Sequence, residues 1–318
     1  MKKILEEVED GTSIGITGHV RPDGDCLGSC LGLALYLRKE LPAAQVDVYL
    51  EQPGDSFNCM KGIDTLMDAS LKEAQDKVYD VFIVLDCSKD RTGSAETLVE
   101  HAKKTINIDH HVSNEGFADV NYIKPDSSSA SELVFELVDE DRLNADIAED
   151  IYIGIMHDTG VLKYSNTKPS TMFAAGKLIS YGFNFSKIIE ETFYEKTYAQ
   201  NLVMGRTVSE SILHLDGKCI SGIVTKERME EYGLTSKDMD GIINRLQNTK
   251  GVACSIFMYE MEKNVFKVSM RSDERVDVSK VAVACGGGGH MRAAGCTMEG
   301  STDEILSTLL KEIKKQLQ

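Results

Sequence analysis

The first half of the chain alternates short apolar runs with longer segments in which apolar residues recur at helical spacing. The all-apolar run Val81–Leu85 is typical of a central parallel strand that is covered on both faces. Helical spacing of apolar residues predicts a helix over residues 27–39. Three further apolar runs predict strands at Ser13–Thr17 and at residues 46–50 and 105–108. Strands that alternate with helices favour an α/β domain with a parallel sheet.

The pattern changes along the second half of the chain. Helical spacing continues over residues 131–139, 147–156 and 168–181, and the polar stretch 188–212 is helical in character with few turn residues. Beyond it, apolar runs predict strands at residues 219–225, 252–260 and 265–269, with a hairpin at residues 262–264 and an amphipathic helix over 302–317. We therefore expect a catalytic domain over 1–187, a helical linker over 188–212, a smaller α+β domain over 213–318, and a cleft between the two domains.

Composition and charge narrow the class of protein. The 318 residues include 35 Lys and Arg against 51 Asp and Glu, a formal net charge of −16. Such acidity argues against a grip on long duplex nucleic acid, which needs clustered basic residues, but bound metal ions can supply local positive charge for a small anionic substrate. No stretch approaches the roughly 18–20 apolar residues of a membrane span. Eight cysteines without a CxxC pair indicate a reduced, cytoplasmic setting.

Five clusters of polar residues carry the candidate chemistry. Four of them directly follow predicted strands or buried segments: His19 to Asp25, Asp86, Asp109 to His111, and His157 to Gly160. Ligands of open α/β sheets bind at the carboxyl ends of the strands. Carboxylates and imidazoles that converge there need cations among them or strongly shifted pKa values. Mixed Asp and His ligands suit manganese better than calcium, and there are enough of them for two ions.

Each cluster also has an ordinary structural interpretation. A lone aspartate after a strand, such as Asp86, usually caps a helix or forms a turn, and Asp23 within Pro-Asp-Gly is by itself a turn residue. Adjacent His110 and His111 can be incidental. The joint occurrence of four clusters, each after an apolar run, favours a functional site. The fifth cluster, GGGGH over residues 286–290, either cradles an anion through backbone N–H groups or forms a flexible turn.

Taken together, the motifs resemble those of the DHH phosphoesterase superfamily. The resemblance rests on His-x3-Asp-x-Asp, a strand-end Asp, Asp-His-His and a later Asp-Thr-Gly, while GGGGH followed by Ala-Ala-Gly is similar to the associated C-terminal substrate domain. Length and motif order are most similar to the nanoRNase and pAp phosphatase branch. The four N-terminal motifs alone do not separate this branch from RecJ-like exonucleases, cyclic-dinucleotide phosphodiesterases or family II pyrophosphatases; the GGGGH element argues against the pyrophosphatases.

The resemblance implies a role for each matching residue. It implies two sets of metal ligands that share Asp86 as a bridge: His19 and Asp23 for one ion, and Asp25, His110 and Asp158 for the other. Asp109 would orient His110. His111 would act with Asp86 in catalysis, facing the phosphate and the leaving oxygen. In the C-terminal domain the resemblance implies substrate contacts from Arg271, Ser272, Gly287, Gly288, Gly289 and His290.

The resemblance also implies a reaction. A hydroxide held between two divalent ions, Mn²⁺ with Mg²⁺ or Co²⁺ as alternatives, would hydrolyse short oligoribonucleotides to 5′-mononucleotides. The same site would convert 3′-phosphoadenosine 5′-phosphate (pAp) to AMP and phosphate. One alternative is a phosphodiesterase of cyclic di-AMP or linear pApA, and another is a non-catalytic nucleotide-binding regulator. We expect neither long duplex nucleic acid nor a membrane as a partner. The sequence leaves open a homodimer, the preferred substrate, the directionality and the physiological metal.

Overall fold

The computed structural model describes residues 3–317 and consists of two compact units that divide between Glu195 and Lys196. The outer ends of the predicted domains, at residues 1 and 318, lie outside the described residues. The division falls inside the stretch 188–212, for which the sequence predicts a linker. Among residues 3–317, no helix combines the length and the hydrophobicity that spanning a bilayer requires. Each unit is described by itself below.

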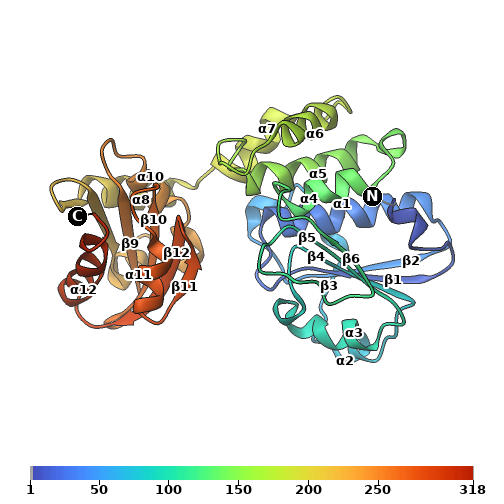
Figure 1. Ribbon diagram of the computed structural model, residues 1–318, viewed down its shortest axis with the longest axis horizontal. Helices are drawn as coiled ribbons and strands as arrows, with labels where there is room; N and C mark the ends of the chain where they lie inside the picture. Colours follow the sequence, from blue (N-terminus) through green and yellow to red (C-terminus); the bar gives the residue numbers. More distant parts are fainter. Residues whose placement is uncertain (1–2, 318) are drawn as a thin grey trace. The chain divides into compact units, whose positions relative to one another are not determined.

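The first unit is built on a six-stranded, fully parallel sheet with the order β3-β2-β1-β4-β5-β6 (Figure 1). The four strands predicted from apolar runs are confirmed to within one residue at each end. The sheet adds β3 and β6, which are short and lie at its edges. The strand bounds are Ser13–Thr17 (β1), Gln45–Tyr49 (β2), Leu66–Met67 (β3), Val81–Leu85 (β4), Thr105–Asp109 (β5) and Val120–Ile123 (β6).

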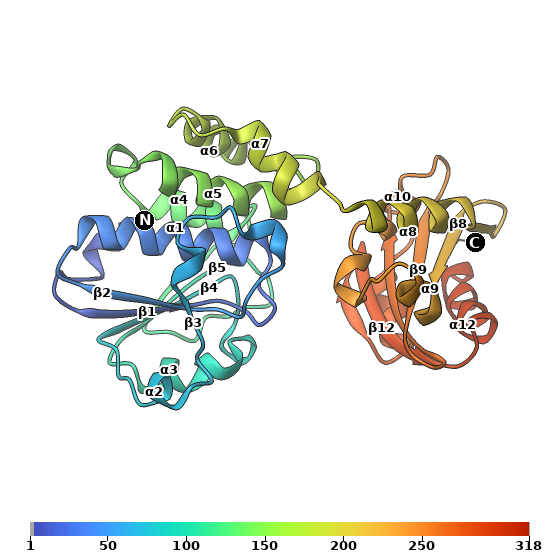
Figure 2. The same ribbon diagram turned by 180° about the vertical axis from the view of Figure 1, so that it is seen from behind.

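Helices cover both faces of this sheet. Figures 1 and 2 show α1, α4 and α5 on one face and the short α2 and α3 on the other. A π-helical turn, Glu190–Tyr194, follows α7. The helix bounds are Gly24–Glu40 (α1), Lys72–Gln75 (α2), Glu96–His101 (α3), Ala130–Leu137 (α4), Ala145–Asp158 (α5), Pro169–Ile179 (α6) and Phe185–Ile189 (α7).

Strand β4 shows why both faces must be covered. Side chains alternate between the faces of a strand, and every residue of β4 is apolar and buried. Ile83 and Leu85 belong to the core beneath α1, α4 and α5, whereas Phe82 and Val84 belong to the core beneath α3. Burial of each such side chain contributes about 1.5–3 kcal/mol to stability. The apolar run in the sequence therefore places the end of β4 between two helical layers.

Glycines allow helices α1 and α5 to cross closely. A Cβ atom built on Gly28 of α1 would lie 2.5 Å from the carbonyl oxygen of Asp150 in α5. A Cβ atom on Gly154 of α5 would lie 1.9 Å from Oγ of Ser131 and 3.0 Å from Oδ1 of Asp25. The close crossing thus holds the first turn of α1, which carries Asp25, against α4 and α5.

We expect Gly154→Ala to lower the free energy of unfolding by about 1–3 kcal/mol, because the added methyl group has no space between Ser131 and Asp25. Urea denaturation measures the effect. Gly176→Ala in α6 is the matched control, since a Cβ atom there meets nothing within 4 Å and alanine favours the helix. Equal stability of the two variants would contradict this account of the crossing.

The second unit is a mixed six-stranded sheet with the order β11-β12-β10-β9-β8-β7. Only the β8–β9 pair is parallel among the described strands of this sheet. The three predicted strands and the hairpin between β9 and β10 are confirmed, while β7, β11 and β12 were not predicted. The strand bounds are Ile212–His214 (β7), Cys219–Val224 (β8), Cys254–Glu262 (β9), Val265–Ser272 (β10), Gly288–His290 (β11) and Ala293–Glu299 (β12).

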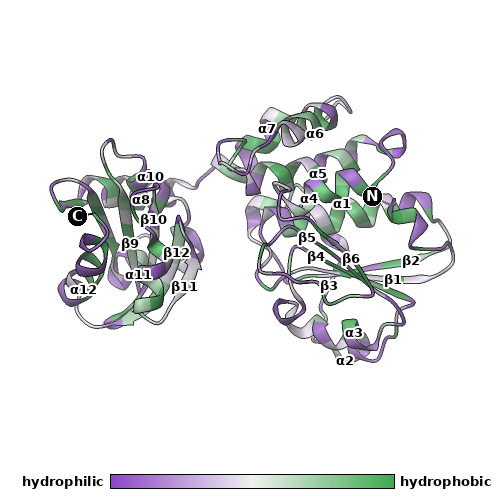
Figure 3. Cartoon of the chain, viewed as in Figure 1, coloured by the Kyte–Doolittle hydropathy of each residue, from purple (hydrophilic) through white to green (hydrophobic). Residues whose placement is uncertain are grey.

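Five helices pack on the second sheet. Figure 3 shows hydrophobic residues along its central strands and hydrophilic residues on the connecting loops. Val268 and Met270 of β10 share a core with α11 and α12, and Phe257 of β9 shares one with α8, α9 and α10. The helix bounds are Tyr198–Ser209 (α8), Lys226–Glu231 (α9), Ile242–Gln247 (α10), Val278–Ala284 (α11) and Thr302–Lys314 (α12). Because α8 packs on this sheet, the second unit begins before residue 213.

Candidate metal centre

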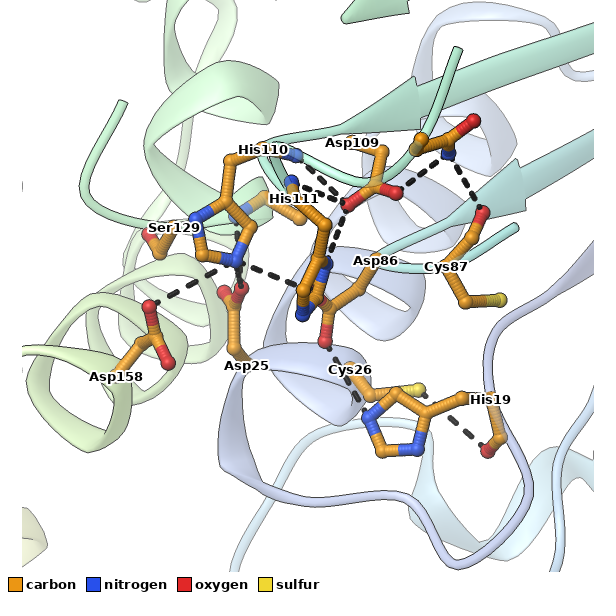
Figure 4. Close-up of polar contacts among 12 residues, drawn as sticks. His19, Asp25, Cys26, Asp86, Cys87, Asp109, His110, His111, Ser129 and Asp158 are labelled. Carbon is orange, nitrogen blue, oxygen red and sulfur yellow. Dashed lines mark hydrogen bonds and ion pairs between the residues drawn. The ribbon is translucent and has the colours of Figure 1, made fainter. Parts of the chain in front are cut away.

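The four polar clusters of the first unit converge beside the carboxyl ends of three neighbouring strands (Figure 4). His19 follows β1, Asp86 follows β4, and His110 follows β5, and these strands are adjacent in the sheet. A parallel sheet brings the ends of neighbouring strands together at one edge. The expectation that sequence-distant clusters meet in space is therefore confirmed by the contacts given below.

Asp86 lies at the centre of the cluster and is 3% exposed. Its Oδ2 atom is 3.4 Å from Nε2 of His19, and its Oδ1 atom is 3.4 Å from Nε2 of His110. Oδ1 is buried and has no hydrogen-bond partner within the described part of the chain. The backbone of Asp86 has φ of +60°, a left-handed conformation that costs a non-glycine residue energy and is found at functional sites. Asp86 is therefore neither a helix cap nor an ordinary turn residue.

His19 and Asp23 form one side of the cluster. Nδ1 of His19 lies 2.9 Å from the carbonyl oxygen of Val20, so this nitrogen carries the proton and Nε2 is left as the potential metal ligand. Nε2 is 3.6 Å from Oδ1 of Asp23. The same Oδ1 accepts the backbone N–H groups of Asp25 and Cys26, so Asp23 also caps the N-terminus of α1. The carboxylate of Asp23 thus caps helix α1 and also faces His19.

Asp25, His110 and Asp158 form the other side. Nε2 of His110 is 3.8 Å from Oδ2 of Asp25 and 3.7 Å from Oδ2 of Asp158. Asp25 lies in the first turn of α1 and Asp158 ends α5, so helix ends supply the carboxylates on this side of the cluster. The buried carboxylate of Asp25 accepts N–H groups of Ala130 and Ser131, at 2.7 and 2.9 Å, from the start of α4.

Asp109 orients His111 rather than the ring of His110, which corrects the role implied by the resemblance. Its Oδ1 atom accepts the backbone N–H groups of His110 and His111 at 2.7 and 3.1 Å. The same Oδ1 atom accepts a hydrogen bond from Nδ1 of His111 at 2.7 Å. The physical reason is the tight turn after β5, which folds the ring of His111 back over the carboxylate two residues earlier. Nε2 of His111 takes no part in this hydrogen bond.

Two buried asparagines support Asp109 and were missed by the sequence reasoning. Nδ2 of Asn114 donates to Oδ2 of Asp109 at 2.5 Å and to Oδ1 of Asn107 at 2.9 Å. Nδ2 of Asn107 donates to the carbonyl oxygens of Val84 and Cys87. The available signal was Asn107 itself, an amide between two isoleucines of the predicted strand TINI, where a buried polar group requires partners.

The electrostatics of the cluster couple carboxylates with imidazoles. Burial opposes a charge on His19 and His110, but their carboxylate neighbours outweigh burial and raise the histidine pKa values to about 11 and about 10. Burial, with repulsion from Asp86, raises the pKa of Asp158 to about 6 and that of Asp25 well above its usual value. Without cations the cluster therefore holds protons on groups that would have to release them to bind a metal ion.

The donor set fits divalent metal ions. Three overlapping groups of residues bring potential ligand atoms within 4.8 Å of one another: Asp86, Asp109, His110 and His111; His19, Cys26 and Asp86; and Asp25, His110 and Asp158. Two of the three contain Asp86. The Oδ1 atom of Asp86 is buried without a hydrogen-bond partner among the described residues, and a bound cation would supply the missing partner. Carboxylate oxygens together with imidazole nitrogens are ligands typical of manganese, iron, cobalt or zinc.

The second unit places Arg271 and His290 in one row of its sheet. Arg271 of β10 and His290 of β11 both pair with Ala293 of β12, so the three side chains share one face. That face is opposite to the one on which Met270 is buried with α11 and α12. His290 is exposed, whereas Ser272 is buried and its Oγ atom donates to the carbonyl oxygen of Val276 at 2.6 Å.

The glycine segment is part of a hairpin rather than a freely turning loop. Gly288 and Gly289 lie in β11, which pairs with β12. A Cβ atom on Gly289, whose φ is +141°, would lie 2.5 Å from Cα of Ala294, and one on Gly287 would lie 2.2 Å from the carbonyl oxygen of Gly295. Gly287 and Gly289 are therefore required by the close approach of the two strands.

Comparison with protein families agrees with these motifs. The DHH family, N-terminal domain, matches residues 13–155, and the DHHA1 domain matches residues 217–318. The chain is 28% identical to the bifunctional oligoribonuclease and PAP phosphatase NrnA of Thermus thermophilus, over 99% of this chain and 93% of the relative. It is 29% identical to the protein of the same name from Bacillus subtilis, over 92% of this chain and 93% of the relative.

Solved structures share the fold. An exopolyphosphatase-related protein from Bacteroides fragilis superposes with a TM-score of 0.88 at 26% identity, covering 96% of this chain and 92% of the other. RecJ of Thermus thermophilus, solved in complex with Mn²⁺, has a TM-score of 0.57 at 12% identity, covering 96% of this chain and 52% of RecJ. The motifs, the sheet topology and these matches agree: the chain combines a DHH family N-terminal domain with a DHHA1 domain.

Proposed function

We propose that this chain is a metal-dependent phosphoesterase that hydrolyses short oligoribonucleotides to 5′-mononucleotides and converts pAp to AMP and phosphate. The observation that carries the proposal is the position of Asp86, whose two carboxylate oxygens each lie 3.4 Å from a different histidine. A carboxylate so placed can serve two ions at once. The names of the relatives from Thermus thermophilus and Bacillus subtilis supply the two substrate classes.

In this proposal two divalent ions, Mn²⁺ before Mg²⁺ or Co²⁺, bind on either side of Asp86. Such ions lower the pKa of water and stabilise negative charge on a phosphoryl group. Two geometries support the ligand sets: Nε2 of His19 faces Asp23, and Nε2 of His110 faces Asp25 and Asp158 in addition to Asp86. RecJ, which shares the fold, was solved with Mn²⁺. The proposed ligands are His19, Asp23 and Asp86 for one ion, and Asp25, Asp86, His110 and Asp158 for the other.

His111 is the proposed proton donor. Its Nδ1 atom donates to Asp109, which fixes the ring and leaves Nε2 for the substrate. The hydrogen bond to Asp109 raises the pKa of His111, because it favours the imidazolium form. A positively charged ring can donate a hydrogen bond to a phosphoryl oxygen or a proton to the leaving oxygen. Asp109 thus acts through His111 as a positioning residue.

The DHHA1 domain is the proposed anchor for the rest of the substrate. Arg271 and His290 share one face of the sheet, on strands two positions apart, about 9–10 Å from each other. A guanidinium group binds phosphate through a planar pair of donors, and an imidazole can donate to phosphate or pack against a base. Ser272 and the glycines at 287, 288 and 289 complete the proposed contacts by shaping the backbone beside these two side chains.

The composition supports short substrates. The 35 basic residues are distributed among 51 acidic ones, which disfavours a positively charged groove along a long nucleic acid. A pair of anchors on one sheet face reaches only a few nucleotides. We therefore propose that long duplexes are not substrates; the predicted inter-domain cleft and the homodimer stay predictions.

A substrate panel tests the proposal. With Mn²⁺ present, we expect rapid hydrolysis of pAp and of RNA dimers to pentamers, and slow hydrolysis of long duplex RNA. Preference for cyclic di-AMP or pApA would assign the same site to signalling dinucleotides instead. Turnover of pyrophosphate alone, or binding of dinucleotides without any turnover, would overturn the proposal.

We expect Asp109→Asn to lower kcat on pAp by about 10–100-fold, because the charged acceptor that orients His111 is lost. Bound metal should remain at the wild-type ratio, since Asp109 is not a proposed ligand. Steady-state kinetics and metal analysis measure the two quantities. The same substitution made in a His111→Ala background should have little further effect on kcat. If the two substitutions lower kcat by independent factors that multiply in the double variant, Asp109 acts on a group other than His111.

A further inference from the structure

A cavity of about 310 Å³ lies beside the candidate metal centre, at the carboxyl ends of β1, β2 and β3. It extends along the same edge of the sheet as the metal centre, because His19, which follows β1, lines the cavity and also contacts Asp86. Figure 4 shows His19 at the margin of the metal cluster, with Asp86 on its other side. No residue of the cavity other than His19 belongs to the proposed ligand sets.

The walls of the cavity are largely apolar. Leu50, Leu66, Met67 and Ala69 line it, from the ends of β2 and β3. Leu50 and Ala69 are buried, and Leu66 and Met67 are half-buried. Small-molecule sites are typically clefts of about 300–1,000 Å³ with apolar walls and a few polar groups. The cavity is therefore large enough for one planar heterocycle, which could pack its faces against these side chains.

Apart from His19, whose ring nitrogens face Val20, Asp23 and Asp86, the charged side chains of the cavity are acceptors. Glu51 and Asp68 line it, and no lysine or arginine does so within the described part of the chain. Oε2 of Glu51 accepts the backbone N–H of Arg21 at 2.8 Å, and Oδ1 of Asp68 accepts that of Ser70 at 2.8 Å. Each carboxylate therefore has a second oxygen free of these backbone bonds. Such a lining repels phosphate and attracts N–H donors.

The two threonine hydroxyls of the cavity do not change this character. Oγ1 of Thr17 donates to the carbonyl oxygen of Tyr49, and Oγ1 of Thr92 donates to that of Lys89. Both protons are thus already used in backbone contacts. The amide of Gln52 and the hydroxyl of exposed Ser94 are the remaining side-chain groups of the lining that offer a donor as well as an acceptor. A ligand of the cavity therefore needs to bring its own N–H groups.

We propose that this cavity is the subsite for the base of the nucleotide adjacent to the reacting phosphate, and that it favours bases with exocyclic amino groups. Adenine, cytosine and guanine present an amino group with two N–H donors to a carboxylate, whereas uracil has a single N3–H donor between two carbonyl oxygens that a carboxylate repels. The position next to His19 fits a base one nucleoside away from a phosphate at the metal centre. The inference deepens the proposed function and rests on it, and it agrees with pAp, whose base is adenine.

The test compares kcat/KM for the RNA dimers ApA and UpU with Mn²⁺. Wild-type protein should prefer ApA, and Glu51→Gln should reduce the ApA to UpU ratio by about tenfold, because a charged acceptor is lost. Ser94→Phe places a ring in the cavity from its exposed rim and should slow ApA more than UpU. Glu9→Gln, an exposed glutamate before β1, is the matched control and should leave the ratio unchanged.

A second readout separates this inference from the proposed function. Adenosine and uridine carry no phosphate, so their binding to the metal-free protein, followed by ligand-detected NMR, does not depend on catalysis. Adenosine should bind more tightly than uridine, and Ser94→Phe should abolish the difference. If no substrate is turned over but this binding pattern holds, the proposed function fails and the base site stands. If turnover occurs but neither variant changes base preference and neither nucleoside binds, the base site is overturned.

Discussion

Replacing Asp86 by asparagine is expected to lower kcat on pAp and on RNA dimers by about a thousandfold or more. The two carboxylate oxygens face His19 and His110 at equal distances of 3.4 Å, so one substitution weakens both proposed ion sites. Metal ions contribute several kcal/mol of charge stabilisation in phosphoryl chemistry, and about 4 kcal/mol corresponds to about a thousandfold in rate. Steady-state kinetics at saturating Mn²⁺ measures the loss.

The control for this prediction is Asp126→Asn. The side chain of Asp126 is 91% exposed and pairs only with Lys168 among the described interactions, so the same chemical change there should leave kcat unaltered. Asp86 also sits in a left-handed backbone conformation that asparagine tolerates well, which keeps the fold of the variant intact. An Asp86→Asn variant that is folded and retains more than about a tenth of wild-type kcat would contradict the bridging role.

Removal of metal by EDTA is expected to abolish hydrolysis and to lower the thermal midpoint of unfolding. Asp25, Asp86 and Asp158 lie around the same histidines, and cations reduce the repulsion among them. An ion present at 100 times its dissociation constant stabilises the native state by about 2.7 kcal/mol. For a unit of this size that corresponds to about 5–10 °C, which differential scanning calorimetry resolves.

The thermal shift has its own control. Adding Mn²⁺ to the EDTA-treated protein should restore both activity and thermal midpoint, whereas Ca²⁺ should restore neither fully, because imidazole ligands suit it poorly. The Asp86→Asn variant should show a much smaller shift on addition of Mn²⁺. Full activity in excess chelator after prolonged dialysis would be incompatible with a metal-dependent reaction.

Most strands of the fold were predictable from the apolar runs of the sequence. Strand β4 was predictable because every residue from Val81 to Leu85 is apolar, as burial between two helical layers requires. Strands β3 and β6 were not, since Leu66–Met67 is only two residues long and Val120–Ile123 carries a polar residue and lies at an edge. Tertiary pairing rather than local pattern makes such segments into strands.

The candidate site was predictable where it depends on strand ends. His19, Asp86 and His110 follow β1, β4 and β5, and the parallel sheet brings them together. Asp25 and Asp158 come from helices α1 and α5, and their convergence depends on the glycine crossing at Gly28 and Gly154. The crossing depends on contacts between different helices, which the spacing of residues within one helix does not reveal.

Two further features lay beyond the sequence pattern. Asp109 accepts a hydrogen bond from the ring of His111 and not from the ring of His110. The backbone conformation of the turn after β5 decides which of the two rings folds back over the carboxylate. The sequence leaves an anion-binding loop or a flexible turn open for residues 286–290, whereas Gly288–His290 form strand β11, whose close pairing with β12 leaves no space for a side chain on Gly289. For Asp109 and for the glycine segment, the conformation of the neighbouring backbone, and not the residue type alone, determines the interactions that the residues make.

The most direct test of the two-ion arrangement is anomalous X-ray diffraction from crystals grown with Mn²⁺. The account predicts two anomalous peaks, one contacting His19 and Asp23 and one contacting Asp25, His110 and Asp158, with Asp86 bound to both. A single peak, or two peaks that do not share Asp86, would contradict it.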